Sequence, residues 1–172
     1  YSVSLAAFCD TLGNPYSKFD PKVLYDPRAD KFVLLFLAGF NPEQTNVIIA
    51  FSETNDPLGE WNFYALPGNP KNNDRWTDFP MFALTEEELF LTINLIIPDE
   101  PWQTGFSETL IWQMSLDKGY NGEPIDAVYY DSIFFAGNPL RNLNPVRGGS
   151  TTYGPDMYFL SNRNFAESND TI

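Results

Sequence analysis

Two aspartates are candidates for catalytic residues in this sequence: Asp20 in "KFDPKVLYD" and Asp78 in "TDFPMFAL". Each opens an apolar segment with the composition of a β-strand, and a proline follows within two residues. Hydrolysis of a glycosidic bond uses a protonated carboxylic acid and a carboxylate held at a defined separation. If both segments are equivalent strands of neighbouring units, Asp20 could act as a general base and Asp78 could orient or tune the site. An aspartate just before a proline also commonly caps a turn, so structural and ligand-binding roles stay open.

Three aromatic residues are candidates for contacting a ligand: Trp102, Tyr25 and Trp76. Trp102 lies in the polar, proline-rich segment "PDEPWQTGF", where an exposed ring would be a platform for a sugar or a protein, unless it folds back over a sheet edge. The segment "NPKNNDRWTD" at 69–78 is rich in oxygen ligands. Because it lacks the spacing of an EF-hand loop, we predict no metal site there, although Ca²⁺ binding stays open.

Composition excludes several classes of function. The chain has no histidine and one cysteine, Cys9, which excludes a histidine-based triad, a Cys/His zinc site and an internal disulfide framework. A net charge of −13 repels phosphate backbones, so nucleic acid is not an expected partner. The longest apolar run, residues 32–40, is about half the length of a membrane-spanning helix. We therefore expect no cofactor and no membrane-spanning segment, and we expect a protein or a carbohydrate as partner.

Short β-strands are the elements that would position these residues. The 14 prolines and 11 glycines come at short intervals that leave no room for a long amphipathic helix, and β-branched and aromatic residues dominate the apolar runs. We expect strands at residues 22–26, 31–39, 46–53, 60–66, 79–84, 88–96, 109–115 and 127–135, and a further start at 150–154 and 157–162.

The strand segments recur in the same order along the chain. Leu34, Leu91 and Leu160 match when the apolar runs are aligned, which gives units at about 18–77, 78–143 and 144–172, the last one incomplete. Four antiparallel strands in each unit fit a propeller blade with long loops. The sequence therefore predicts an all-β chain, two blades and part of a third of a single β-propeller domain, as a fragment of a larger ring. A β-sandwich of the same strands is the alternative.

The segment "FSETNDPLGEW" at 51–61 links two of these strands. Asp56, Pro57 and Gly59 have the positions that a type I turn favours, so we interpret the segment as architecture. Together with "FDPKVLYDPRADKFVLL", "TDFPMFALTEEELFLTIN" and "ETLIWQMSLDKGYNGE", it resembles secreted bacterial β-propeller proteins. The resemblance covers about residues 18–123, and more loosely 144–162.

The resemblance implies an extracellular or cell-envelope protein that acts as a non-catalytic binding or assembly scaffold, either alone or within a larger assembly. Sialidase-like and five-bladed glycosidase propellers are more distantly similar. They imply the alternative of a carbohydrate-active hydrolase, with Asp20 and Asp78 lining a central channel and the general acid lying outside this segment. The spacing of Asp56 and Gly59 departs from the sialidase Asp-box, which argues against a direct analogy with sialidases.

Overall fold

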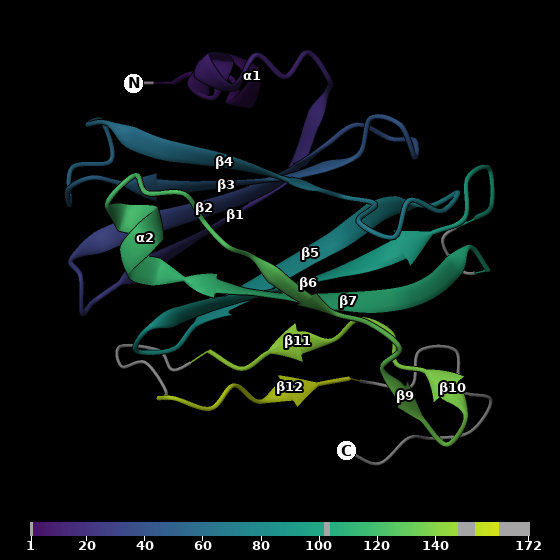
Figure 1. Cartoon of the computed structure of the whole chain (residues 1–172). Helices are drawn as coiled ribbons and strands as arrows, with labels where there is room; N and C mark the ends of the chain where they lie inside the picture. Colours follow the sequence, from purple (N-terminus) through teal and green to yellow (C-terminus); the bar gives the residue numbers. More distant parts are fainter. Residues whose placement is uncertain (1, 102–103, 148–153, 162–172) are drawn as a thin grey trace.

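The chain folds into an all-β structure (Figure 1). The computed structural model describes residues 2–101, 104–147 and 154–161. Strands account for 47% of the residues and helices for 8%, so the predicted fold class is confirmed at this level. Within these residues, none of the helices has the length and apolar character needed to cross a membrane.

Two four-stranded antiparallel sheets form the body of the molecule, and in each one every strand pairs with the next in sequence. The first sheet contains β1 (Lys18–Asp26), β2 (Lys31–Ala38), β3 (Asn46–Ser52) and β4 (Trp61–Pro67). The second sheet contains β5 (Trp76–Leu84), β6 (Glu88–Ile96), β7 (Phe106–Ser115) and β8 (Val128–Tyr130). The single strand expected at 127–135 is split, because β9 (Phe134–Phe135) leaves the second sheet and pairs with β10 (Asn138–Pro139).

Short elements cover the two sheets. The helix α1 (Leu5–Phe8) and a 3₁₀ helix (Asp10–Leu12) lie on the first sheet, and α2 (Leu116–Tyr120) follows β7. A small hairpin of β11 (Asn144–Pro145) and β12 (Phe159–Leu160) lies under the second sheet. From top to bottom, Figure 1 therefore shows α1, the first sheet, the second sheet and the β11–β12 hairpin.

The main hydrophobic core lies between the two sheets. Fully buried side chains of β2 and β3, such as Leu35 and Phe51, pack in one cluster with those of β6 and β7, such as Leu91 and Leu110. A smaller core lies between the first sheet and α1, and it contains Cys9, Phe36, Ala38 and Ile48. Both faces of the first sheet are thus buried, which explains why its central strands are nearly continuous apolar runs.

A β-bulge at the same place in each sheet fixes how the two sheets correspond. In β1, Asp20 and Pro21 stand opposite one residue of β2, and in β5, Phe79 and Pro80 stand opposite one residue of β6. Matching the two bulges makes Leu34, which pairs with Val23, the counterpart of Leu91, which pairs with Phe82. The register thus gives Leu34 and Leu91 corresponding positions, as the alignment of the two segments in the sequence does.

The correspondence shows that the two sheets stack in the same sense. Phe36 and Ile93 are counterparts, because each stands opposite a bulge. Phe36 faces the small core under α1, whereas Ile93 faces the first sheet in the main core. Equivalent faces of the two sheets thus point in the same direction. The face of the first sheet that lies away from α1 packs on the face of the second sheet that contains Ile93.

The β11–β12 hairpin repeats this relation on the second sheet. β11 lies against β5 and β6, as β5 lies against β1 and β2. The hydroxyl of Thr92 donates to the carbonyl oxygen of Leu143 (2.6 Å), and the Asn94 side-chain amide donates to Asn142 Oδ1 (2.5 Å). The hairpin falls in the segment expected to begin a third unit, although residues 150–153 and 162 of the strands expected there lie outside the described residues.

Matching turns close the first hairpin of each sheet. Asp26 Oδ1 accepts hydrogen bonds from the amides of Arg28 and Ala29 (2.9 and 3.3 Å). In the second sheet, Thr85 Oγ1 accepts in the same way from the amides two and three residues further along the chain (3.4 and 3.1 Å). Asp26 is fully buried, and its Oδ2 accepts a hydrogen bond from the hydroxyl of Tyr120 in α2 (3.0 Å). This bond connects the first sheet to the helix that follows the second.

Tyr120→Phe should lower the free energy of unfolding by about 1–3 kcal/mol, because it leaves a buried carboxylate oxygen without its donor. Burial and the negative charge of Asp26 raise the pKa of Tyr120 far above its usual value, so the hydroxyl stays a donor across the neutral range. The matched control is Tyr130→Phe, which removes an exposed hydrogen bond to Gln113 (2.6 Å). Urea denaturation measures both variants, and equal losses would contradict the importance of the buried bond.

Candidate functional site

The structure places Asp20 and Asp78 in neighbouring strands, β1 and β5, next to the two bulges. They are not equivalent positions, so that part of the sequence-based expectation is wrong. The counterpart of Asp20 is Phe79, and both have left-handed backbone conformations with φ of 51° and 52°. The counterpart of Asp78 is Phe19, the last paired residue before its bulge. The offset arises because Asp20 directly precedes its proline, whereas Asp78 is separated from its proline by one residue.

The two carboxyl groups interact electrostatically. Asp78 is half-buried, and burial raises the pKa of its carboxyl group. A hydrogen bond from the Phe79 amide (2.8 Å) opposes this rise in the pKa, and the negative charge of Asp20 adds to it. Asp20 is exposed, and no described residue donates a hydrogen bond to its carboxylate. The pair therefore combines a carboxyl group that holds its proton more tightly than usual with a neighbouring negative charge.

Asp78 should titrate above the usual range of an aspartate when its carboxyl carbon is followed by NMR, and Asp20→Asn should move the midpoint downward by removing a negative charge. Between the usual and the raised pKa, the folded protein binds more protons than the unfolded chain. Raising the pH through this window therefore lowers the free energy of unfolding, and Asp78→Asn should remove that part of the pH dependence. An unchanged midpoint in Asp20→Asn would contradict the proposed coupling.

A row of aromatic rings lies at the same edge of the sheets. Phe40 stacks on Phe19, with ring centroids 4.4 Å apart and planes 18° apart. Trp76, the first residue of β5, meets Phe40 edge to face at 6.4 Å. Phe40 is 55% exposed, so the row presents a ring to solvent close to the bulges. The sequence predicts Trp76 as a ligand contact but not Phe19 or Phe40, because no local pattern shows that these rings come together.

Tyr25 does not add to this edge. Tyr25 is exposed and lies five residues beyond Asp20, about 16 Å along an extended strand. Its hydroxyl donates to Asp30 Oδ1 (2.6 Å), a bond that raises the pKa of the tyrosine. Trp102 lies outside the described residues. The candidate site therefore consists of Asp20, Asp78, Phe40 and Trp76.

The oxygen-rich loop at 69–78 is tied down by an ion-pair cluster. Lys71 Nζ lies 2.8 Å from Glu108 Oε1 and 2.9 Å from Asp131 Oδ2. Asn69 Oδ1 accepts a hydrogen bond from the amide of Asn73 (3.3 Å). The described part of the chain contains no group of three or more His, Cys, Asp or Glu residues arranged to hold a metal ion. The side chains of Lys71 and Asn69 therefore hold this loop in place.

No protein-family model, no curated protein and no solved structure matches this chain. The site is consequently defined by its geometry. It is a pair of interacting acids beside a row of aromatic rings, of which Phe40 is exposed, at the edge where β1 and β5 meet. Aromatic faces suit a sugar ring or an apolar side chain, and carboxylates accept hydrogen bonds from hydroxyl or amine groups.

Proposed function

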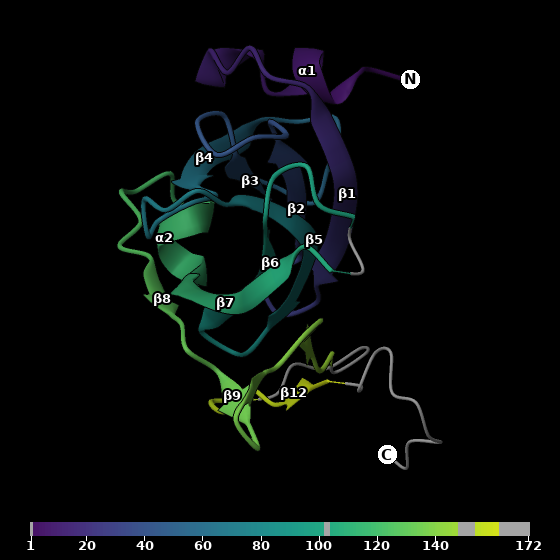
Figure 2. The same cartoon turned by 90° about the vertical axis from the view of Figure 1, so that its right-hand side faces the viewer.

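We propose that the chain is a portion of a β-propeller in an exported or cell-surface protein, and that it serves as a non-catalytic binding or assembly scaffold. The stacking of the two four-stranded sheets in the same sense carries this proposal. Blades of a propeller follow one another in this way around an axis, and the position of β11 on β5 and β6 continues the series. Figure 2 shows β1 and β5 on one side of the stack and β4 and β8 on the other, as inner and outer strands would lie.

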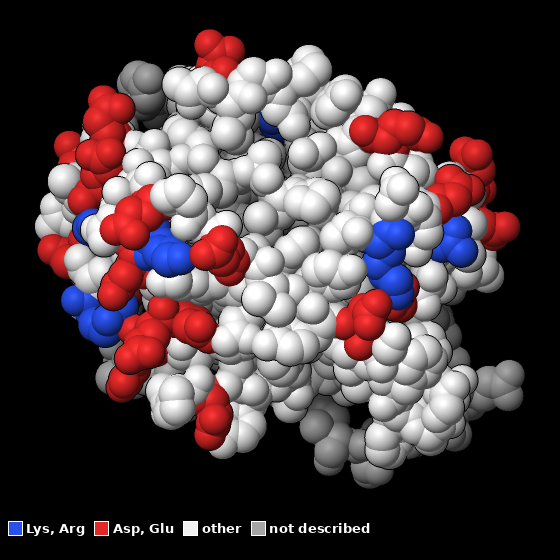
Figure 3. Space-filling view, in the orientation of Figure 1, with Lys and Arg blue, Asp and Glu red and all other residues white. Residues whose placement is uncertain are grey.

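The surface supports a binding role. Figure 3 shows the face that carries β4 and α2, on the side of the stack away from β1 and β5 (Figure 2). Acidic side chains gather toward both ends of this face, and the band between them is nearly free of charged groups. Such a band can contact a neutral carbohydrate or a protein surface, while the net charge of −13 repels nucleic acid. The exposed ring of Phe40 and the half-buried ring of Trp76 are the contacts that we assign to the ligand.

Two measurements test this proposal. The structure of the intact polypeptide should show further four-stranded sheets around the axis beside β1 and β5, and a closed two-sheet sandwich would overturn the propeller. A glycan array and a screen for protein partners should find a ligand that Phe40→Ala and Trp76→Ala weaken. Phe134→Ala is the matched control, because Phe134 has the same 55% exposure as Phe40 but lies in β9.

A glycoside hydrolase is the second candidate, and the raised pKa of Asp78 beside Asp20 favours it. A carboxyl group with a raised pKa beside a carboxylate is the kind of pair that glycoside hydrolysis uses, so this candidate would give Asp78 the role of the general acid, which the sequence-based hypothesis placed outside the segment. Release of reducing ends from a panel of polysaccharides tests this candidate. Activity that is lost in both Asp78→Asn and Asp20→Asn would overturn the non-catalytic scaffold, whereas binding without turnover would support it.

A further inference from the structure

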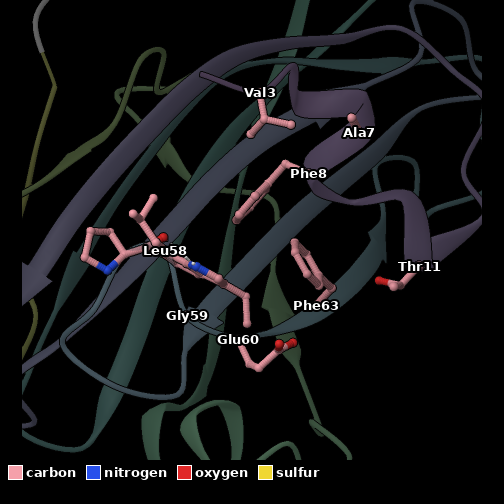
Figure 4. A pocket seen from close by; sticks show the side chains of 10 residues that line it. Val3, Ala7, Phe8, Thr11, Leu58, Gly59, Glu60 and Phe63 are labelled. Atoms are coloured by element: carbon pink, nitrogen blue, oxygen red, sulfur yellow. Dashed lines mark hydrogen bonds between the residues drawn. The ribbon is translucent and has the colours of Figure 1, made fainter. Parts of the chain in front are cut away.

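A second concave site lies on the outer side of the first sheet, away from the β1–β5 edge. It is a pocket of about 450 Å³ between α1 and the turn that joins β3 to β4. Figure 4 shows Phe8 and Phe63 in its middle, Val3 and Leu58 on its rim, and Glu60 at one end. The volume lies in the range of small-molecule sites, which are about 300–1,000 Å³.

Three aromatic rings build the wall of this pocket. Phe8 of α1 meets Trp61 of β4 at 5.3 Å with an angle of 77° between the ring planes. Phe8 also meets Phe63 at 5.0 Å with an angle of 73°. Because the rings are nearly perpendicular, the wall presents ring faces in more than one direction. The face of an aromatic ring carries negative potential and attracts cations.

The turn between β3 and β4 gives the pocket a rigid rim. The amide of Gly59 donates to the carbonyl oxygen of Asp56 (3.0 Å), and that of Leu58 donates to Asp56 Oδ1 (2.9 Å). The turn predicted from the sequence at Asp56–Gly59 is therefore present. The indole N–H of Trp61 donates to the carbonyl oxygen of Pro57 (3.2 Å), which fixes the ring. The same bond occupies the indole donor, which is then not available to an anionic ligand.

The charge of the lining selects for a cation. Glu60 is the one ionisable side chain among the described residues that line the pocket, and no lysine or arginine is among them. The hydroxyl of Thr11 and the carboxylate of Glu60 lie near opposite edges of Phe63 in Figure 4. Aromatic walls with a carboxylate at one end match a ligand that is both bulky and positively charged.

We propose that this pocket binds an alkylated ammonium group, such as the trimethylammonium head of choline or the side chain of a methylated lysine. The aromatic faces of Phe8, Trp61 and Phe63 would surround the alkyl groups, and Glu60 would neutralise the charge. This inference does not depend on the propeller or on the Asp20–Asp78 edge. It assigns a ligand class to a surface that the scaffold proposal leaves unassigned.

Titration calorimetry with choline chloride tests the inference, and 3,3-dimethylbutan-1-ol serves as the neutral probe of the same shape. We expect choline to bind about threefold to tenfold more tightly than the alcohol, because only choline gains the cation–π and carboxylate interactions. A methylated-lysine peptide and its unmodified form, titrated in parallel, distinguish a free small molecule from a protein ligand. Potassium chloride at the same concentration controls for salt.

Glu60→Gln should weaken choline binding about threefold or more and should leave the binding of the neutral alcohol unchanged. Glu43→Gln is the matched control, because Glu43 is an exposed acid in the loop between β2 and β3, at the opposite end of β3 from the pocket. Thermal unfolding verifies that both variants fold. Equal affinities for choline and the alcohol, an unchanged affinity in Glu60→Gln, or no binding of any probe would each overturn the proposal.

Discussion

Phe51→Ala should lower the free energy of unfolding by about 3–5 kcal/mol, the usual effect of truncating a fully buried phenylalanine. Phe51 is completely buried at the end of β3. Its ring meets those of Tyr64 (5.8 Å, 80°) and Tyr120 (5.3 Å, 84°), edge to face. It also packs so closely on α2 that a Cβ added at Gly119 would lie 2.6 Å from the ring. Removing the ring therefore opens a cavity between the first sheet and α2.

A control variant distinguishes the effect of this cavity on stability from the general effect of removing a phenylalanine ring. Phe134→Ala removes the same atoms from a position that is 55% exposed and should change the free energy of unfolding by less than about 1 kcal/mol. Because Phe51 belongs to the core that the two sheets share, circular dichroism and tryptophan fluorescence, to which buried Trp112 of the second sheet contributes, should report one shared transition. Two separate transitions in the parent protein would contradict a common core.

The order and type of the strands could be predicted from the sequence. The strand expected at 88–96 coincides with β6, and that expected at 31–39 differs from β2 by one residue. These strands are dense in apolar residues and are bounded by polar turns, so local pattern and tertiary structure agree. The side-chain oxygens of Asp26 and Thr85 close their turns through the local hydrogen bonds that such residues favour.

The candidate site depends on long-range pairing, which the sequence does not display. The register of β1 on β2 places Asp20 in the bulge of β1, and the register of β5 on β6 places Phe79, and not Asp78, in the bulge of β5. A shift of one residue moves a side chain to the other face of a sheet, so the apparent equivalence of Asp20 and Asp78 failed for a small local reason. The contact between Phe19 and Phe40 likewise depends on where β1 begins and β2 ends in the paired sheet, and not on either segment alone.

The way the two sheets stack also depends on long-range contacts that local sequence patterns do not show. The repeated order of strands predicts two similar sheets, but it does not determine which faces meet. Phe36 and Ile93 are counterparts with similar side chains, yet one packs under α1 and the other packs against the first sheet. Both environments are apolar, so hydrophobic pattern alone fits a sandwich as well as a propeller portion. The bulges supply the register that establishes the same-sense stacking.

Gly39→Ala should lower the free energy of unfolding by about 2–4 kcal/mol, from left-handed backbone strain together with overpacking. Gly39 directly follows β2 and has a φ of 80°. A Cβ at this position would lie 2.3 Å from the carbonyl oxygen of Gln44, a backbone atom that cannot rotate away. The amide of Gln44 donates to Asn41 (3.0 Å to Oδ1), so the loop on the other side is also fixed.

Gly137→Ala is the matched control, because Gly137 has nearly the same φ, 81°, and has nothing within 4 Å of an added Cβ. This variant should lose only about 1–2 kcal/mol of stability, because the added Cβ introduces left-handed backbone strain. The difference in stability between the two variants therefore measures the crowding at Gln44. Gly39 immediately precedes Phe40. Its substitution should therefore also displace the exposed ring and weaken any ligand of the β1–β5 edge, which Gly137→Ala leaves intact. Equal losses of stability in the two variants would contradict a tightly packed turn behind Phe40.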